Sequence, residues 1–332
     1  MMPVLLGQSK AIETVRAQLQ RYAHCDVQVL IEGETGTGKE VAAREIHYAS
    51  ARRDFPFVPV NCGAIPDSLV ESELFGHARG AFTDAKAAQA GLIDHARGGT
   101  LFLDEVDALS GKAQVTLLRF LQDNEYRPVG GGAIRKSDAR VIAAANSNLA
   151  EQTAAGQFRR DLHYRLNALY VQLPPLRERA GDTAILAEHF LQAAASRLRG
   201  PAKRWSESAM QALLAYAWPG NVRELENIAL RAYLGSEGEV IEFADLAAAE
   251  PAFADSPPPS HVPNRVERRG SGFVAAKTRT VYEFERNYLT LLINRASGNV
   301  SAAARLSGTE RRQLGKLLAK HGIKAGPSRP RQ

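Results

Sequence analysis

The chain has 332 residues and a net charge of +6; 45% of its residues are hydrophobic and 23% are charged. These values are typical of a soluble globular protein with room for two or three domains. No run of 18 apolar residues occurs, the first eight residues lack a signal-peptide pattern, and two cysteines are too few for a disulfide framework. The sequence therefore argues against a membrane-spanning or disulfide-rich secreted protein, and we expect a cytoplasmic protein without a membrane partner.

From residue 5 to about residue 173, apolar strand-like runs alternate with amphipathic stretches. This alternation predicts an α/β domain with a parallel sheet. The predicted strands span residues 27–31, 57–61, 100–104, 139–145 and 168–173.

A glycine-rich segment follows the first predicted strand and precedes a helical stretch, which is the arrangement of a phosphate-binding P-loop. Its residues are Gly33, Glu34, Thr35, Gly36, Thr37, Gly38, Lys39 and Glu40. The glycines allow backbone N–H groups to converge on phosphate oxygens, and the helix N-terminus adds partial positive charge. Lys39 is expected to bridge the β- and γ-phosphates. Glu40 replaces the hydroxyl residue that usually contacts Mg²⁺, so other groups must hold the metal.

A second motif ends the predicted strand at 100–104 with two carboxylates, Asp104 and Glu105, which is the Walker B pattern. We expect Asp104 to orient Mg²⁺ through its water shell and Glu105 to polarise the attacking water. The alternative is a surface turn that happens to carry acidic residues, and the apolar residues directly before the pair argue against it. The two motifs together predict nucleotide hydrolysis, with ATP and Mg²⁺ as cofactors.

From residue 182 to about residue 249, apolar residues recur at three- and four-residue spacing, which predicts helices throughout. The predicted helices span residues 183–199, 206–215 and 222–234. Ser206 is expected to cap the second of these helices. The segment Trp218-Pro219-Gly220-Asn221 is expected to form a turn and cap that leads into the third.

Residues 251–280 are rich in proline, glycine and serine, which is typical of a flexible tether. Three short helical stretches follow, at 282–295, 299–306 and 310–320. From residue 261 onward there are 15 lysines and arginines against four acidic residues, a net charge of +11, so the preceding part carries −5. This asymmetry indicates a basic module that contacts nucleic acid, with a solvated positive tail as the alternative.

Assembled in this order, the motifs resemble those of the bacterial enhancer-binding proteins, AAA+ ATPases that activate RNA polymerase carrying sigma-54. The matching strings are GETGTGKE (33–40), VNC (60–62), ESELFGHARGAFTDA (71–85), GTLFLDE (99–105), FRRDLHYRLN (158–167), LPPLRER (173–179) and WPGNVRELEN (218–227). The resemblance implies an AAA+ P-loop NTPase fold, with a parallel sheet and an α-helical lid, followed by a small all-α helix-turn-helix domain. We expect an α/β ATPase subdomain at 1–178, the lid at 179–250, a flexible linker at 251–280 and a Fis-type DNA-binding domain at 281–325.

The resemblance also implies roles for residues outside the two nucleotide motifs. Arg159 and Arg165 match trans-acting arginine fingers, which reach the nucleotide of a neighbouring subunit in a hexameric ring; surface ion pairs are the alternative for these arginines. Arg223 matches a second sensor that reaches from the lid to the phosphates, and Asn146 matches a first sensor near the γ-phosphate. Asn61 matches a switch residue that hydrogen-bonds Glu105, although an ordinary asparagine at the end of a strand is equally compatible with the chemistry.

The 80–85 segment matches the GAFTGA loop through which the family contacts sigma-54. Its residues are Gly80, Ala81, Phe82, Thr83, Asp84 and Ala85. Asp84 replaces the second glycine of the family motif, which restricts the backbone and adds negative charge at the contact. We favour retained sigma-54 remodelling, because the surrounding string is otherwise intact.

The last two predicted helices resemble a Fis-type helix-turn-helix. Thr309 is expected to cap the second helix, whose basic residues suit a reader of the DNA major groove. The implied DNA-binding residues are Asn299, Ser301, Thr309, Arg311, Arg312, Lys316 and Lys320. The alternative is a basic helix that binds a protein partner.

These features predict a sigma-54-dependent transcription activator that binds upstream double-stranded DNA and hydrolyses ATP to remodel the closed RNA polymerase complex. Because the ATPase motifs begin near the first residue, the resemblance implies regulation by a separate trans-acting protein, with a constitutive activator as the alternative. One alternative is an ATP-gated DNA-binding regulator or repressor that does not remodel sigma-54, which Asp84 favours. A second is an AAA+ remodeller of a non-transcriptional target.

Overall fold

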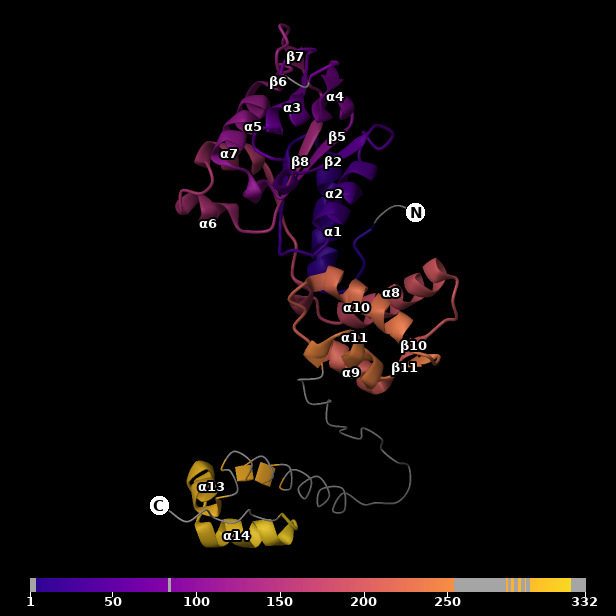
Figure 1. Ribbon diagram of the computed structural model, residues 1–332, viewed down its shortest axis with the longest axis vertical. Coiled ribbons are helices and arrows are strands. Elements are labelled where there is room, and N and C mark those ends of the chain that lie inside the picture. Colours follow the sequence, from indigo (N-terminus) through magenta and orange to yellow (C-terminus); the bar gives the residue numbers. More distant parts are fainter. Residues whose placement is uncertain are drawn as a thin grey trace. The chain divides into compact units, whose positions relative to one another are not determined.

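The structure is a computed structural model that describes residues 4–82, 85–253 and 299–323, together with a few positions between 285 and 296 (Figure 1). The chain divides into two compact units, Met1–His261 and Val262–Gln332. Thr83, Asp84, residues 254–280 of the predicted linker and most of the predicted helix at 282–295 lie outside the described residues.

Five parallel strands form the central sheet of the first unit, in the order β2-β5-β8-β1-β9. Their bounds are β1 Val29–Glu32, β2 Phe57–Asn61, β5 Thr100–Asp104, β8 Arg140–Ala145 and β9 Leu169–Gln172. All five predicted strands are confirmed, with ends displaced by one or two residues in β1, β8 and β9. The register pairs Ile31 with both Ala144 and Val171, which places β1 between β8 and β9.

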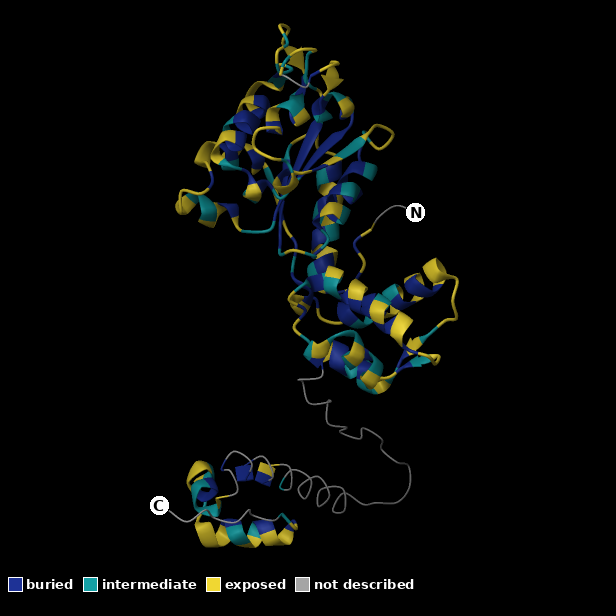
Figure 2. Ribbon diagram, in the orientation of Figure 1, coloured by how far each residue is buried: buried dark blue, intermediate teal, exposed yellow. Residues whose placement is uncertain are grey.

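Side chains along each central strand alternate between two hydrophobic cores, as the pleat of a strand requires. Leu30, Leu101 and Ala143 pack on one face of the sheet, beneath α3 (Val70–Phe75), α5 (Gly111–Asp123) and α7 (Arg160–Leu166). Ile31 and Phe102 pack on the other face, beneath α1 (Lys10–Ala23) and α2 (Lys39–Tyr48). Figure 1 shows these two helical layers, and Figure 2 shows the strands between them as buried.

The remaining elements of this α/β part are short. They are α4 Leu92–His95, α6 Leu149–Ala154, the 3₁₀ turns η1 Cys62–Ala64, η2 Val106–Ala108 and η3 Leu176–Glu178, and the hairpins β3 Gly76–His77 with β4 Gln89–Ala90 and β6 Glu125–Tyr126 with β7 Arg135–Lys136. Backbone bonds from Ala78 N–H to Val129 O and from Val129 N–H to Gly76 O join the two hairpins. The segment between β3 and β4, which contains the predicted sigma-54 loop, is therefore anchored to the second hairpin.

Four helices build the predicted lid: α8 Asp182–Leu198, α9 Glu207–Ala215, α10 Asn221–Gly235 and α11 Phe243–Ala249, with a small pairing of β10 Arg204–Trp205 and β11 Val240–Ile241. The three predicted helices are confirmed. Ser206 caps α9 as predicted, because its side chain accepts the Ala209 N–H at 3.2 Å. Phe253, in the 3₁₀ turn η4 Pro251–Phe253, is 1% exposed in the lid core. Residues 251–253, predicted as linker, therefore fold onto the lid.

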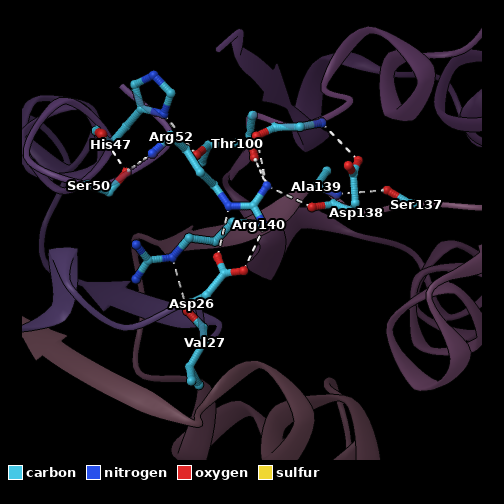
Figure 3. Close-up of polar contacts among 12 residues, drawn as sticks. Asp26, Val27, His47, Ser50, Arg52, Thr100, Ser137, Asp138, Ala139 and Arg140 are labelled. Carbon is cyan, nitrogen blue, oxygen red and sulfur yellow. Dashed lines mark hydrogen bonds and ion pairs between the residues drawn. The ribbon is translucent and has the colours of Figure 1, made fainter. Parts of the chain in front are cut away.

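Charged residues at the end of the sheet where the strands begin form a closed network (Figure 3). We call this end the amino edge. Arg52 donates Nε and Nη2 to the two carboxylate oxygens of Asp26, at 2.8 and 2.7 Å, and donates Nη1 to the backbone oxygens of Gly98, Gly99 and Asp138. Arg140, 4% exposed, donates to Val27 O and Tyr22 O. These two arginines tie together the segments that enter β1, β5 and β8.

The C-terminal unit contains α13 Val300–Ser307 and α14 Arg311–Lys320, whose buried residues include Ala303, Leu314 and Leu318. Asn299 caps α13 by accepting the N–H groups of Ser301 and Ala302. The predicted Thr309 cap is wrong: Glu310 is the N-cap of α14, and the Thr309 hydroxyl donates to Ser307 instead. Among the residues that the structure describes, no helix is long and apolar enough to cross a membrane.

Candidate functional site

The predicted nucleotide motifs meet where the strands of the parallel sheet end, which we call the carboxyl edge. The P-loop follows β1, Asn61 ends β2, Asp104 ends β5 and Asn146 directly follows β8. Ligands of open α/β sheets bind at this edge, because the loops there are free to form a crevice.

The P-loop backbone adopts the conformations that its glycines were expected to allow. Gly36 and Gly38 have φ values of +80° and +102°, which side chains other than glycine rarely adopt. Gly38 is the N-cap residue of α2, so the helix N-terminus points into the loop. Thr37, 2% exposed, braces the loop by donating its hydroxyl to Glu34 O at 2.8 Å. The result is a helix terminus suited to bind an anion.

Lys39 is a buried cation whose partners are all uncharged oxygens. Its Nζ donates to Gly33 O at 2.7 Å, to Glu34 O at 3.1 Å and to Asn146 Oδ1 at 2.7 Å, and the residue is 6% exposed. Burial lowers the pKa of Lys39, while Asp104 and Asp107 oppose that shift from a distance. A buried ammonium without a contacting carboxylate favours the binding of an anion such as a phosphate.

Asp104 and Glu105 lie side by side at the end of β5. Burial raises the pKa of Asp104, whose Oδ1 accepts the Glu105 N–H at 3.0 Å. Glu105 itself has φ +55°, an uncommon backbone conformation for glutamate, and such conformations are concentrated at functional sites. The pair is therefore half-buried, and its backbone is constrained as expected of a Walker B motif.

The two predicted asparagines differ in how they join this site. Asn146 contacts the P-loop directly, because its Oδ1 accepts hydrogen bonds from Lys39 Nζ and from the Thr35 hydroxyl, at 2.7 and 3.2 Å. Asn61 instead caps η1 by accepting the Ala64 N–H at 3.1 Å. A Cβ on Gly63 would lie 2.9 Å from Glu105 Oε2 and 3.4 Å from Asn61 Oδ1, so both side chains flank Gly63. The hydrogen bond from Asn61 to Glu105 stays a prediction.

A cavity of about 300 Å³ opens between the P-loop and the lid. Its polar side contains Lys39, Asp104, Glu105, Asn146 and Arg223. Its apolar side is formed by Val4, Leu5, Leu6, Val41, Leu186, Phe190 and Val222. The phosphate groups of a nucleotide could bind at the cationic P-loop, and its flat, apolar nucleobase could pack against the apolar side of the cavity.

The lid contacts the P-loop directly at the start of α10. Gly36 O accepts the N–H groups of Val222 and Arg223, at 3.0 and 3.3 Å. Arg223 lines the cavity, and its contact with the phosphates stays a prediction. The turn and cap predicted for Trp218-Pro219-Gly220-Asn221 are confirmed: the Asn221 N–H donates to Trp218 O at 2.9 Å, and Gly220 is the N-cap of α10.

Two carboxylates of the P-loop form ion pairs with arginines of the same chain. Glu34 forms a bidentate ion pair with Arg177 at 2.5 and 2.8 Å, and Arg177 followed by Asn221 lowers the pKa of Glu34 to about 2. Glu40 pairs with Arg44 at 2.7 Å, one helical turn along α2. Glu34 was predicted to bind the nucleotide, and in the structure its carboxylate binds the segment that leads into the lid.

The two predicted arginine fingers lie outside the cavity of their own chain. Arg159 pairs with Asp161 at 2.7 Å on an exposed surface. Arg165 donates to the backbone oxygens of Leu121 and Gln122 at the end of α5. Neither arginine is among the residues that line the cavity, which is the placement required of a residue that acts on a neighbouring subunit.

The predicted sigma-54 loop is described at residues 80–82 and 85. Gly80 N–H donates to Ala85 O and Ala85 N–H donates to Phe82 O, so these residues close the loop at its base. Phe82 is 43% exposed and its ring lies 4.8 Å from that of His77. Ala85 was predicted to contact sigma-54. It is 5% exposed, so in this conformation its side chain supports the loop and offers no contact surface.

The predicted DNA-binding residues of α14 form a basic, exposed surface. Arg311, Arg312, Lys316 and Lys320 are all exposed, whereas Leu314 and Leu318 point into the core. Lys320 is paired with Glu285 at 2.9 Å, which reduces the positive charge that it can offer. Ser301 lies on α13, half-buried beside the Asn299 cap.

Several residues of this site were missed in the sequence. Asp107 accepts the N–H groups of Asn146 and Ser147. Asp182, 0% exposed, binds Arg179 at 3.0 Å and accepts the N–H groups of Gln8 and Ser9, which holds the N-terminal segment against the cavity. Arg177 and Arg179 lie in the LPPLRER string and Asn221 in WPGNVRELEN, so the only sequence signal was their membership in these motifs.

The fold and the site define a P-loop ATPase of the AAA+ class with a helical lid. The class follows from the β2-β5-β8-β1-β9 order, the P-loop after β1 and the carboxylate pair after β5.

Comparison with known proteins identifies the family. Residues 5–172 match the sigma-54 interaction domain, residues 177–260 the AAA+ ATPase lid domain and residues 280–321 the bacterial regulatory proteins of the Fis family. The chain therefore belongs to the sigma-54-dependent transcriptional regulators, a family that activates transcription through ATP hydrolysis.

Relatives and solved structures agree with this assignment. The chain is 41% identical to the C4-dicarboxylate transport transcriptional regulatory protein DctD of Rhizobium meliloti (strain 1021), over 98% of this chain and 67% of DctD. It is 42% identical to the transcriptional regulatory protein GlrR of Escherichia coli (strain K12), over 93% and 66% of the two chains. The crystal structure of NtrX from Brucella abortus in complex with ATP is similar, with a TM-score of 0.67 and 34% identity over 96% of this chain and 69% of NtrX. The chain spans about two thirds of the length of these relatives.

Proposed function

We propose that this chain binds and hydrolyses ATP at the carboxyl edge and uses the energy to remodel the sigma-54 RNA polymerase complex. The buried Lys39 ammonium carries this proposal, because its three uncharged partners leave its charge available to the β- and γ-phosphates. Mg²⁺, held by Asp104 through water, would neutralise phosphate charge. Glu105 would orient and polarise the attacking water, while Asn146 and Arg223 hold the γ-phosphate from either side.

The active assembly in this proposal is a ring, most simply a hexamer. Arg159 and Arg165 would then meet the nucleotide of the adjacent subunit and stabilise charge on the departing γ-phosphate. Their place outside the cavity of their own chain supports this role. The Arg159–Asp161 pair is exposed, so it is weakly held and can yield to a phosphate.

The output of the ring is the 80–85 loop, which would contact sigma-54 through the exposed Phe82. Binding of α14 to an upstream DNA site would bring the ring to its promoter, in the cytoplasm where the polymerase acts.

In vitro transcription from a sigma-54 promoter on a supercoiled template tests the proposal. The wild-type chain with ATP should support open-complex formation, and Glu105→Gln should abolish it while ATP binding persists. Glu188→Gln, which changes an exposed glutamate of the lid, is the matched control and should retain activity. An Asp84→Gly variant in the same assay measures how far Asp84 alters the sigma-54 contact.

Two results would contradict the proposal in different ways. Normal ATP hydrolysis without any open complex would leave a DNA-bound ATPase that does not remodel sigma-54. For the ring, mixing Lys39→Ala subunits with Arg165→Ala subunits should restore part of the hydrolysis lost in each alone. Assembled mixed rings that stay inactive would rule out fingers acting between subunits.

A further inference from the structure

Asn221 occupies an unusual position at the junction of the lid and the P-loop. It is the first residue of α10, it is 0% exposed, and its φ of +54° lies in the left-handed region. Asparagine adopts that region more readily than most residues. The backbone is therefore turned sharply at the point where the lid helix begins, and the side chain is directed away from a normal helix position.

The Asn221 amide makes three hydrogen bonds to two segments that are distant from it in the sequence. Its Oδ1 accepts the Leu176 N–H at 2.8 Å, in the segment that connects the sheet to the lid. Its Nδ2 donates to Glu34 Oε2 and to Thr35 O, both at 3.1 Å, in the P-loop. A side-chain amide has one acceptor oxygen and two donor hydrogens. At Asn221, the oxygen and both hydrogens are used in these three hydrogen bonds.

Neighbouring contacts make this junction tight. Gly36 O accepts the next two N–H groups of α10, and a Cβ on Gly36 would lie 2.3 Å from Gly220 O. The P-loop and the lid therefore meet backbone against backbone. The bidentate pair between Arg177 and Glu34 holds the carboxylate that receives the Asn221 amide. A shift of the P-loop is transmitted to α10 through these contacts.

We propose that Asn221 is a positioning residue, which couples the P-loop to the lid and so places the Arg223 guanidinium at the phosphates. Arg223 is two residues along the same helical turn, and its own N–H is bound to Gly36 O. The proposal rests on the proposed ATPase function, because it assigns Asn221 a role only through Arg223. Asn221 itself is not expected to touch the nucleotide.

A double-mutant cycle between Asn221 and Arg223 tests this coupling, with ATP turnover as the measurement. Asn221→Asp keeps the shape, the acceptor for Leu176 and the tolerance of a left-handed backbone, but it loses both donor bonds and faces the Glu34 carboxylate. We expect kcat to fall about tenfold to a hundredfold, as when one charged contact to the transition state is lost. In the Arg223→Ala background, the same change should cost less than about twofold.

Two further variants keep the test decisive. Glu34→Gln combined with Asn221→Asp reverses the hydrogen bond, since the glutamine amide donates to the aspartate, and should restore part of kcat. If Asn221→Asp does not fold, Asn221→Gly retains the backbone conformation and enters the same cycle. Asn227→Asp, an exposed change on the same helix, should leave kcat unchanged.

Multiplicative losses from Asn221 and Arg223, with no restoration by Glu34→Gln, would overturn the proposal and leave Asn221 with a purely structural role. The variants Lys39→Ala and Glu105→Gln, measured in the same assay, separate this result from a failure of the proposed function. If those two variants retain hydrolysis, the ATPase assignment fails. If they lose it while the cycle is multiplicative, only the coupling through Asn221 fails.

Discussion

Both edges of the central sheet carry charged groups, but the charges have different partners at the two edges. At the amino edge, all the donor nitrogens of Arg52 have partners, and its charge is neutralised by Asp26 (Figure 3). At the carboxyl edge, the hydrogen bonds of Lys39 to the described residues all go to uncharged oxygens, and Asp104 and Glu105 lie next to each other with no ion pair to a described residue. The charges of Arg52 and Asp26 at the amino edge are satisfied by each other, whereas in our proposal the charge of Lys39 at the carboxyl edge is completed by a ligand.

This difference separates charges that stabilise the fold from charges that serve a reaction. A paired and hydrogen-bonded ion contributes to stability, whereas a buried ion without its partner costs stability in the free protein. Sites that bind substrate commonly carry such a cost. Substitutions at the two edges should therefore affect different measurements.

The largest effect is expected at Glu105. Glu105→Gln should lower ATP turnover by about 10²–10⁴-fold, because the water loses its general base. The free energy of unfolding should not fall, since the substitution removes one of two adjacent carboxylates. Steady-state hydrolysis and thermal unfolding check the two halves of this prediction, with Glu188→Gln as control. Turnover within about twofold of wild type would refute the assignment of the base.

The buried pair that supports the cavity should give the largest loss of stability. Asp182→Ala leaves the Arg179 guanidinium, 2% exposed, without its partner and frees the N–H groups of Gln8 and Ser9. Loss of one partner from a buried pair costs about 3–5 kcal/mol. Urea unfolding should show this loss, and Asp54→Ala, which removes an exposed partner of Arg53, should cost less than about 1 kcal/mol. Equal costs would contradict the importance of burial here.

The amino edge should show a smaller, purely structural effect. Arg52→Ala removes the side-chain donor to the backbone oxygens of Gly98, Gly99 and Asp138, of which Gly99 O keeps the Arg140 N–H, and should lower the free energy of unfolding by about 1–3 kcal/mol. Turnover per folded molecule should be unchanged, because this edge lies opposite the P-loop. Arg53→Ala is the adjacent control, since its side chain is 63% exposed. A large fall in kcat for Arg52→Ala would erase the functional distinction between the two edges.

The smallest effect is a pH dependence at Glu34. Arg177 and Asn221 lower the pKa of Glu34 to about 2, so the carboxylate stabilises the fold above its usual pKa of 4.5 and this contribution is lost as the pH falls toward 2. The pair is about half exposed, so its contribution at pH 7 should be under about 1 kcal/mol and should shrink in high salt. Denaturant titrations of wild type and Glu34→Gln at pH 7 and pH 4 measure the difference. A difference that grows on acidification would contradict the ion pair.

The nucleotide motifs and the strands that carry them could be predicted because each is local. Asp104 ends an apolar run, Asn146 directly follows one, and Gly36 and Lys39 lie in the glycine-rich segment after a third, so the parallel sheet brings them to one edge. The partners of Glu34 and Asp182 could not be predicted, because Arg177 and Gln8 lie 143 and 174 residues away from them. Such pairs leave no periodic signal in a single sequence.

The helix caps show the same limit at short range. Ser206 and Asn299 were each followed by a clear helical pattern, and both lie at the caps of their helices. At Thr309, the next residue Glu310 begins the turn equally well, and the Thr309 hydroxyl finds a closer partner in Ser307. Side chains that can bond locally in two ways do not fix a boundary from sequence alone.

The central claim is that the phosphates of ATP neutralise the Lys39 ammonium at the carboxyl edge. Calorimetric titration of the protein with ATP in the presence of Mg²⁺ tests this claim most directly. Lys39→Met keeps the apolar stem and removes the charge, whereas Lys112→Met does the same at an exposed position on α5. We expect wild type and Lys112→Met to bind ATP with equal affinity and Lys39→Met to bind it at least about tenfold more weakly, with no loss of thermal stability. Equal affinity of Lys39→Met and wild type would contradict the account.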